Sequence, residues 1–196
     1  ATVLANLQLH RAAFEVALLS VALGVVNHLV LAVLLYRLFT SSGEIAAMLI
    51  LVFTAISAPL SLAAIARQMD ALALLDALPT IGPELLRSQV VLAMRGYSSL
   101  FLTSAIFWGL WLLPLGWLVL RCGFVPRVFG LLIIAGAPFY IAAFAGPILD
   151  PNFQLSPLCR AISLVSGIPD VIGEGGLALW LLFVGARRRT PASPPR

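Results

Sequence analysis

The sequence contains no lysine and few charged residues of any kind. Charged side chains make up 10% of its 196 residues, whereas a soluble domain carries roughly 25% because its surface must face water. Hydrophobic residues make up 61%, and the mean hydropathy is +1.06. Because so few charges cannot cover a globule of this size, the composition predicts a protein embedded in lipid.

Two further shortages exclude classes of function. The two cysteines, Cys122 and Cys159, are too few for a disulfide scaffold and too far apart in sequence for a clustered zinc site. The twelve basic residues are all arginine, and they are scattered singly at the ends of apolar stretches, except for residues 187–189. This spacing is typical of membrane anchoring and not of a nucleic-acid-binding surface, so we expect no nucleic-acid partner.

Catalytic motifs are also missing. The sequence has no HExxH, no P-loop, no GxSxG and no dinucleotide-binding glycine fingerprint. Ser98, Ser99 and Ser104 have no nearby histidine that could activate a hydroxyl. We therefore expect that the protein is not an enzyme.

Five apolar stretches are present that each approach the roughly 20 residues needed to cross a bilayer. They predict an all-α, polytopic transmembrane helix bundle, forming a single domain over residues 1–186. The expected spans lie near residues 16–36, 45–65, 98–120, 128–148 and 161–186. A basic, proline-rich tail follows at residues 187–196.

The connection between the second and third spans is different in character, because charges alternate there with leucine and alanine. Leu72, Leu75 and Leu78 recur every three residues, which predicts a short interfacial helix over Met69–Leu78. Pro83 fits the first position of the next helix, with Glu84 favourable in its first turn.

The orientation follows from the distribution of arginine. If the spans alternate, one side of the membrane holds seven arginines against the single acid Glu44, and the positive-inside rule places that side in the cytoplasm. The C-terminus is then cytoplasmic and the first residue lies on the outer side. Cys122 would lie inside and Cys159 outside, so no bridge between them is expected. The seven arginines are Arg37, Arg121, Arg127, Arg187, Arg188, Arg189 and Arg196.

Three stretches carry a resemblance to a known family. They are residues 34–39 (LLYRLF), residues 123–136 (GFVPRVFGLLIIAG) and residues 173–185 (GEGGLALWLLFVG). The chain resembles bacterial multi-pass membrane proteins that are classified only as a domain of unknown function. The resemblance implies residence in the bacterial cytoplasmic membrane, and six spans, of which the first would precede this chain. The chain departs from the family at Thr40 and Ser41, where basic residues are usual. The resemblance implies no substrate or active site.

Asp170 and Glu174 are candidates for an intramembrane polar site, because they are four residues apart and share one helix face. An acid near the bilayer centre costs at least about 2.5 kcal/mol and usually faces a cavity or a partner. The pair could titrate protons or bind a cation, with one carboxyl protonated. Alternatively, Pro169 begins the helix and both acids lie near the interface.

His28 lies in the middle of the first span, beside Asn27. A neutral imidazole there could ligate a haem iron or a chlorophyll magnesium, although a bis-histidine haem would need a partner subunit. The simpler interpretation is a hydrogen bond between helices, which we favour, and we expect no metal site otherwise. Arg95 and Tyr97, at the start of the third span, are either an anion or head-group site or ordinary interfacial anchors.

Three functional hypotheses remain. The first is an accessory or scaffold subunit that packs against other membrane proteins, suggested by the apolar body and the lack of a catalytic constellation. The second is a small proton-coupled transporter that uses Glu174 and Asp170, with broken helices lining its site. The third is a subunit that binds pigment or haem through His28. We favour the first.

Overall fold

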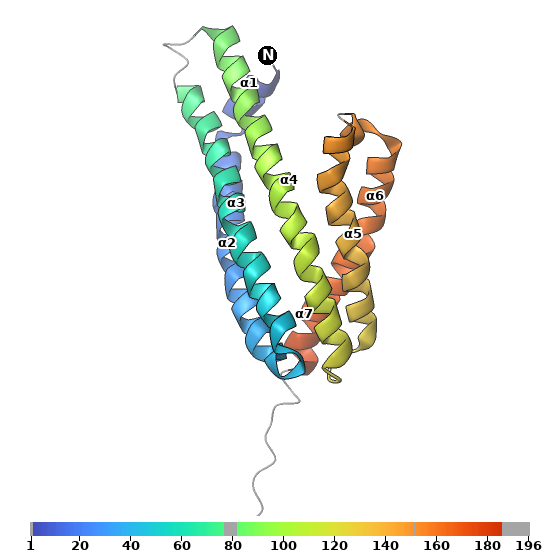
Figure 1. The fold of residues 1–196 in the computed structure, drawn as a ribbon. Helices are drawn as coiled ribbons and strands as arrows, with labels where there is room; N and C mark the ends of the chain where they lie inside the picture. The colour runs from blue at the N-terminus through green and yellow to red at the C-terminus, as the bar shows by residue number, and fades with distance from the viewer. Residues whose placement is uncertain (1, 77–81, 151, 186–196) are drawn as a thin grey trace, which may run out of the picture. The chain divides into compact units, whose positions relative to one another are not determined.

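The computed structural model describes residues 2–76, 82–150 and 152–185, and the regular structure within these ranges is entirely helical (Figure 1). Five of these helices are long and apolar enough to cross a membrane. This confirms the predicted all-α, polytopic transmembrane architecture. In chain order the α-helices are α1 (Thr2–Leu9), α2 (Arg11–Phe39), α3 (Glu44–Asp76), α4 (Pro83–Arg121), α5 (Arg127–Leu149), α6 (Pro157–Ile168) and α7 (Gly176–Trp180).

The last helical segment is a composite. Ser156 caps the N-terminus of α6, because its side-chain oxygen accepts a hydrogen bond from the Cys159 amide at 3.1 Å, and Pro157 follows in the first turn. The helix then widens into a π-helical segment, η3 (Pro169–Gly175), returns to α-helix in α7, and ends in a second π-helical segment, η4 (Leu181–Gly185). The tail at residues 187–196 lies outside the described residues.

No separate interfacial helix begins at Met69 among the described residues. The backbone continues α3 without a break as far as Asp76, and residues 77 and 78 lie outside the described residues. The prediction of an independent helix there is wrong, because Leu72 and Leu75 are buried against α2 and so continue the packing of the spanning helix. A short additional helix does exist, but it is α1. The helix expected after Pro83 begins at that residue, as predicted.

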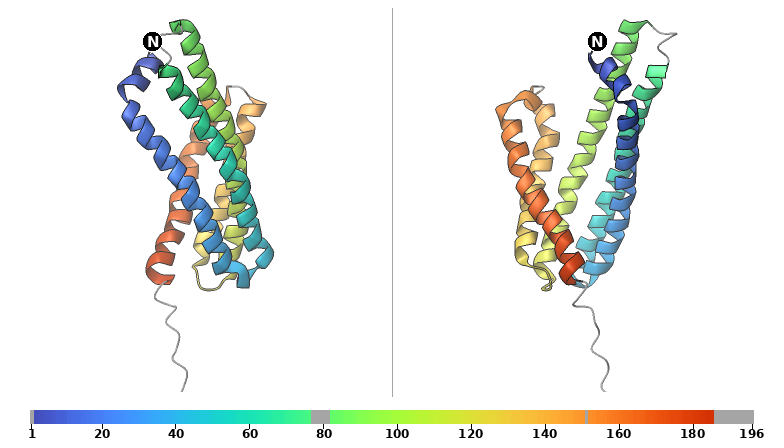
Figure 2. Two further views of the ribbon diagram at one scale, coloured as in Figure 1. Left: turned by 90° about the vertical axis from the view of Figure 1, so that its left-hand side faces the viewer. Right: turned by 180° about the vertical axis from the view of Figure 1, so that it is seen from behind.

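The chain divides into two compact units. The first contains Ala1–Leu34 and Leu51–Phe107, and the second contains Leu35–Ile50 and Trp108–Arg196. In the first unit, α2, α3 and the beginning of α4 run side by side (Figure 2). Two apolar clusters hold these helices together. The cluster between α2 and α3 contains Leu18, Ile65, Leu72 and Leu75, and the cluster between α3 and α4 contains Ala71, Leu86, Val90 and Ala93.

An ion pair fastens the same unit at the ends of α2 and α3. The guanidinium of Arg11 donates hydrogen bonds to both carboxylate oxygens of Asp76, one of them from Nη2 at 3.1 Å, and its Nε donates to Glu15 at 2.9 Å. All three side chains are exposed to water, so the pair contributes little to stability. It links the start of α2 to the end of α3.

In the second unit, glycines bring the backbones of α4 and α5 into contact. A Cβ added at Gly116 would lie 2.7 Å from the carbonyl oxygen of Gly130, and a Cβ added at Gly130 would lie 2.7 Å from the carbonyl oxygen of Gly116. The two glycines therefore face each other, and neither position has room for a side chain. Small residues of this kind allow close helix packing inside a membrane.

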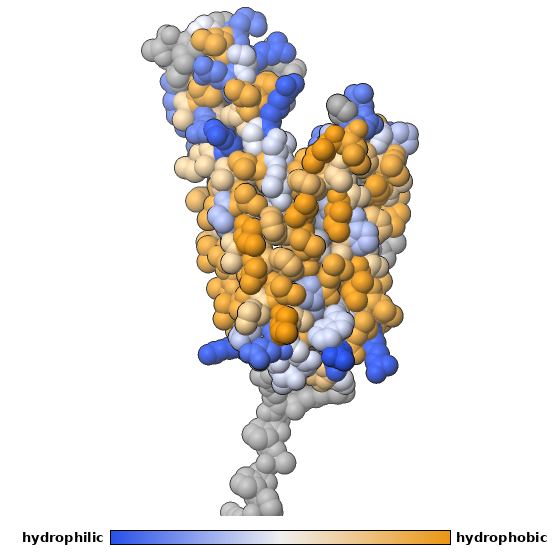
Figure 3. Space-filling view, in the orientation of Figure 1, coloured by the Kyte–Doolittle hydropathy of each residue, from blue (hydrophilic) through white to orange (hydrophobic). Residues whose placement is uncertain are grey.

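On the face that Figure 3 shows, apolar side chains cover the middle of the helices, and hydrophilic residues gather at their ends. In the last helical segment, Leu164 is 81% exposed and Leu182 is 65% exposed. Such exposure would be unfavourable in water, but lipid tails are as apolar as leucine. The surface therefore supports the conclusion that the protein is embedded in a bilayer.

Candidate functional site

The three stretches that carry the family resemblance meet in the second unit. Phe39 is the last residue of the first stretch, Phe124 is the second residue of the next, and Trp180 belongs to the third. The rings of Phe39 and Phe124 are stacked with centroids 5.7 Å apart, and the rings of Phe124 and Trp180 are tilted with centroids 6.4 Å apart. Phe39 is completely buried. The end of α2, the α4–α5 turn and α7 are thus joined by a series of three rings, which we call the ring series.

A second aromatic contact lies at the end of α4. A Cβ added at Gly43 would lie 2.6 Å from the indole ring of Trp117, so space and not backbone conformation requires glycine there. The guanidinium carbon of Arg121 lies 4.5 Å from the centroid of the same indole, within the range of a cation–π interaction. Arg121 is thereby held at the end of its helix.

The second and third stretches also pack on each other through glycine. A Cβ added at Gly173 would lie 3.2 Å from the backbone nitrogen of Ile133, and one added at Gly176 would lie 2.6 Å from the ring of Phe129. Ile133 and Phe129 belong to α5, whereas both glycines belong to the last helical segment. The residues that the three stretches contribute are therefore packing residues, and they set how closely the helices approach.

The arrangement defines a class, a multi-pass helical membrane protein whose recognisable sequence stretches form helix–helix contacts. Within that class, the chain belongs to the family described as "Domain of unknown function (DUF4386)", which it matches over residues 1–185. This confirms the suspected membership of a domain-of-unknown-function family. No curated protein and no solved structure matches the chain.

Asp170 and Glu174 both lie in the π-helical segment η3. The alternative in which Pro169 begins the last helix is wrong, because the helix begins at Pro157, twelve residues earlier. Pro169 is the first residue of η3. Glu174 is half-buried, and η3 packs along α5 in the same unit. Single π turns are frequent at functional sites, and this one was not evident in the sequence.

The structure places Asn27 and His28 on different faces of α2. Asn27 is exposed, whereas His28 is half-buried. The second histidine, His10, lies eighteen residues earlier on almost the same helical axis, roughly 27 Å away at 1.5 Å per residue. The two histidines therefore cannot ligate the same metal ion within one chain. Across the described ranges, no group of three or more metal-binding side chains comes together.

Arg95 lines a groove that the sequence did not reveal. The groove has a volume of about 540 Å³ and lies between α3 and α4 in the first unit. Its second arginine, Arg67, comes from α3, 28 residues away in the chain. Tyr97 does not line this groove but stacks on Phe101, with ring centroids 5.6 Å apart. The only signal in the sequence was that each arginine borders an apolar stretch.

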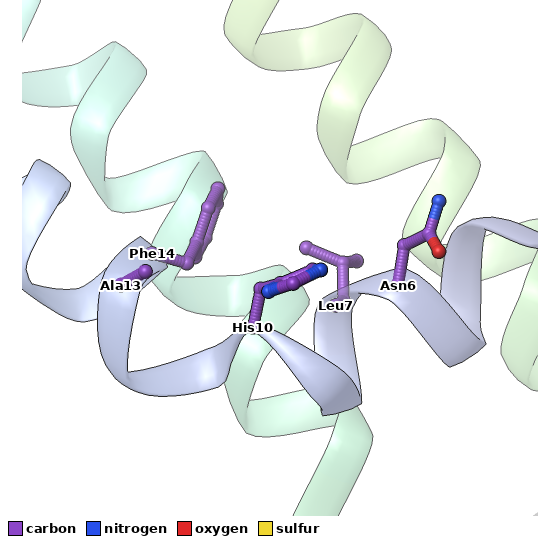
Figure 4. A pocket seen from close by; sticks show the side chains of 5 residues that line it. All are labelled: Asn6, Leu7, His10, Ala13 and Phe14. Carbon is purple, nitrogen blue, oxygen red and sulfur yellow. The ribbon is translucent and has the colours of Figure 1, made fainter.

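A smaller pocket lies at the start of the chain, where His10 sits between Leu7 and Phe14 (Figure 4). Its lining is completed by Asn6 and Ala13, and its volume is about 370 Å³. The described lining residues come from three consecutive turns of the α1–α2 segment, and none of them is an acid, an arginine or a lysine. The pocket therefore offers no set of converging polar groups of the kind that fixes a ligand in place.

Proposed function

We propose that the protein is a non-catalytic subunit that packs against other membrane proteins through one face of α2. The observation that carries this proposal is the exposed face formed by Ala17, Ser20, Gly24 and Asn27, which we call the small face. These positions follow one another at intervals of three and four residues, so they lie on one side of the helix. A Cβ added at Gly24 would meet no atom within 4 Å.

The small face does not pack within its own unit. The side of α2 that contacts α3 carries Phe14, Leu18, Ala22 and Val25 instead. Small side chains on an exposed transmembrane face let a second helix approach closely, and polar side chains add hydrogen bonds across the contact. Ser20 already donates a hydrogen bond to the Val16 carbonyl oxygen at 2.8 Å. Its hydroxyl can therefore face lipid without a partner helix.

Asn27 is the residue of the small face that most needs a hydrogen bond from another subunit. Its carboxamide has no hydrogen bond to any part of the chain that the structure describes, although it lies in the middle of an apolar span. Burying an amide without a hydrogen bond costs several kcal/mol in a hydrocarbon environment. A helix of another subunit with a polar side chain at this depth would remove that cost.

The packing role of the three family stretches is consistent with this proposal. Their glycines and aromatic rings hold helices together. The proposed role therefore uses what these stretches provide, namely a scaffold of fixed helices.

The test is co-purification in mild detergent, followed by crosslinking from the small face. Gly24→Cys, in a background with Cys122→Ser and Cys159→Ser, should crosslink to a stoichiometric partner. Gly24→Leu combined with Asn27→Leu should reduce recovery of that partner about tenfold or more, because a hydrogen bond and the close approach are both lost. Gly167→Leu is the matched control, since Gly167 is also exposed with no atom near its Cβ position.

Two outcomes would contradict the proposal. One is equal loss of the partner in the control variant. The other is a monomer that takes up protons in proteoliposomes and loses this activity on Glu174→Gln, which would favour a proton-coupled transporter built on η3. That second candidate is supported by one observation, the placement of both acids in a π-helical segment.

We further infer that the turn between α4 and α5 faces the cytoplasm. Arg121 and Arg127 flank this five-residue turn, and Arg37 lies in the last turn of α2; the arginines at 187–189 lie outside the described residues. Loops this short obey the positive-inside rule most strictly. The 23 residues of α5, roughly 34 Å of helix, then carry the chain to the outer side.

Thiol labelling measures this orientation. Cys122 and Cys159 are both free and half-buried. A membrane-impermeant maleimide applied to intact cells should label Cys159 and spare Cys122, and both should react after the membrane is permeabilised. Labelling of Cys122 but not Cys159 in intact cells would reverse the orientation.

A further inference from the structure

The groove between α3 and α4 combines two arginines with neutral hydrogen-bonding groups. Arg67 and Asp70 come from α3, whereas Gln89, Arg95 and Ser99 come from α4. The α4 residues Gln89, Leu92, Ala93, Gly96 and Ser99 lie on one side of the helix, because they are spaced by three or four residues. Two helix faces of the same unit thus form the walls, and we call this site the arginine groove.

The charges in the arginine groove leave one arginine available. Arg67 is paired with Asp70, its Nη1 lying 3.3 Å from the carboxylate oxygen. Arg95 is exposed, and its guanidinium has no hydrogen bond or ion pair with any described residue. The groove therefore has a net positive charge, and Arg95 can bind an anion without giving up another partner.

Gly96 keeps the floor of the groove open. A Cβ added there would lie 3.4 Å from Cγ and Cδ of Arg67, in ordinary van der Waals contact. The aliphatic part of Arg67 therefore lies across Gly96, and any longer side chain at this position would push the arginine aside or fill the groove.

The groove lies where the apolar parts of α3 and α4 end. Arg67 comes directly after the apolar part of α3, and Arg95 comes shortly before the apolar part of α4. These helices have 33 and 39 residues, roughly 50 and 58 Å, whereas the hydrocarbon core is about 30 Å thick. Their charged ends therefore extend beyond the hydrocarbon, into the zone of the lipid phosphates.

Apolar side chains border the same groove. Leu74, Leu92 and Ala93 line it beside the arginines, and Leu92 is 70% exposed. A small inorganic anion would make no favourable contact with these apolar side chains. A phospholipid has both a charged head group, which the arginines can bind, and acyl chains, which the apolar side chains can contact. We propose that the arginine groove binds the phosphate of an anionic phospholipid, with Arg95 as its main contact and Arg67, Gln89 and Ser99 around it.

The test is native mass spectrometry of the full chain released from nanodiscs that contain phosphatidylglycerol and phosphatidylcholine in equal amounts. Phosphatidylglycerol should be retained by the unmodified protein in preference to phosphatidylcholine. Arg95→Gln should lower its occupancy about fivefold, the effect of one arginine near a lipid surface, and Arg67→Gln should add to that loss. Gly96→Leu should lower occupancy although it changes no charge.

Arg87→Gln is the matched control, since Arg87 is exposed on the same helix but does not line the groove. An equal loss of phosphatidylglycerol occupancy in Arg87→Gln would show that the lipid responds to the general surface charge, and it would overturn the proposal. Displacement of the lipid by millimolar inorganic phosphate would assign the site to a soluble anion instead. A thermal melt of each variant verifies folding, and Arg95→Gln, whose side chain is exposed, decides the matter if Gly96→Leu fails to fold.

Discussion

Replacing Gly130 with alanine is expected to destabilise the protein by about 1–3 kcal/mol, the usual cost of overpacking. The new Cβ would meet the carbonyl oxygen of Gly116 at 2.7 Å and Cγ of Leu120 at 2.9 Å. A backbone oxygen cannot rotate away as a side chain can, so α4 and α5 would have to separate. The loss should appear as unfolding at lower denaturant concentration in a detergent–SDS titration of the purified protein.

Gly167→Ala provides the control for that experiment. Its Cβ would meet nothing within 4 Å, so the better helix propensity of alanine should leave stability unchanged or raise it by up to about 1 kcal/mol. If Gly130→Ala unfolds at the same point as the control, the backbones of α4 and α5 do not touch at Gly116.

The second large effect is expected at the ring series. Phe39→Ala should cost about 3–5 kcal/mol, because Phe39 is completely buried and its ring stacks on Phe124. Phe39→Leu retains most of the volume and should cost only about 1.5 kcal/mol, which separates loss of the ring from loss of bulk. The free energy of unfolding from the same SDS titration measures both values.

A matched substitution tests whether position matters. Phe183 lies in η4 and is 60% exposed, so Phe183→Ala removes the same ring from a lipid-facing position. It should change the free energy of unfolding by much less than Phe39→Ala. Similar losses in the two variants would mean that the ring series does not hold the end of α2.

The helical class of the fold could be predicted from the sequence because it follows from composition and the length of apolar stretches. The end of α3 could not, because it depends on packing against neighbouring helices. Residues 66–76 contain enough charge to look like a connection, yet Ala71, Leu72 and Leu75 pack on α2 and α4 and extend α3 by three turns. Tertiary packing decided the helix end where local sequence pointed to a break.

The candidate sites, too, could be predicted from the sequence only in part. The sequence singled out Arg95, but its partnership with Arg67 depends on two helices joined through a long connection. The sequence likewise singled out Asp170 and Glu174, whereas no signal in it predicted the π-helical backbone that carries them. The side chain of Asp170 lies outside what the structure describes. The sequence alone identified chemically distinctive residues, but it did not identify the residues that lie beside them in the fold.

The facing glycines of α4 and α5 bear on how the protein is made. Only residues 122–126 separate the two helices, and Gly123 adopts a positive φ of 70° in that turn, a conformation that suits glycine. Closing so short a loop costs little chain entropy, so these helices can pair as a hairpin soon after both have entered the bilayer. The last segment, still emerging from the ribosome, would then find Ile133 and Phe129 already in place for Gly173 and Gly176. Biogenesis would therefore proceed by docking a late helix onto an early hairpin.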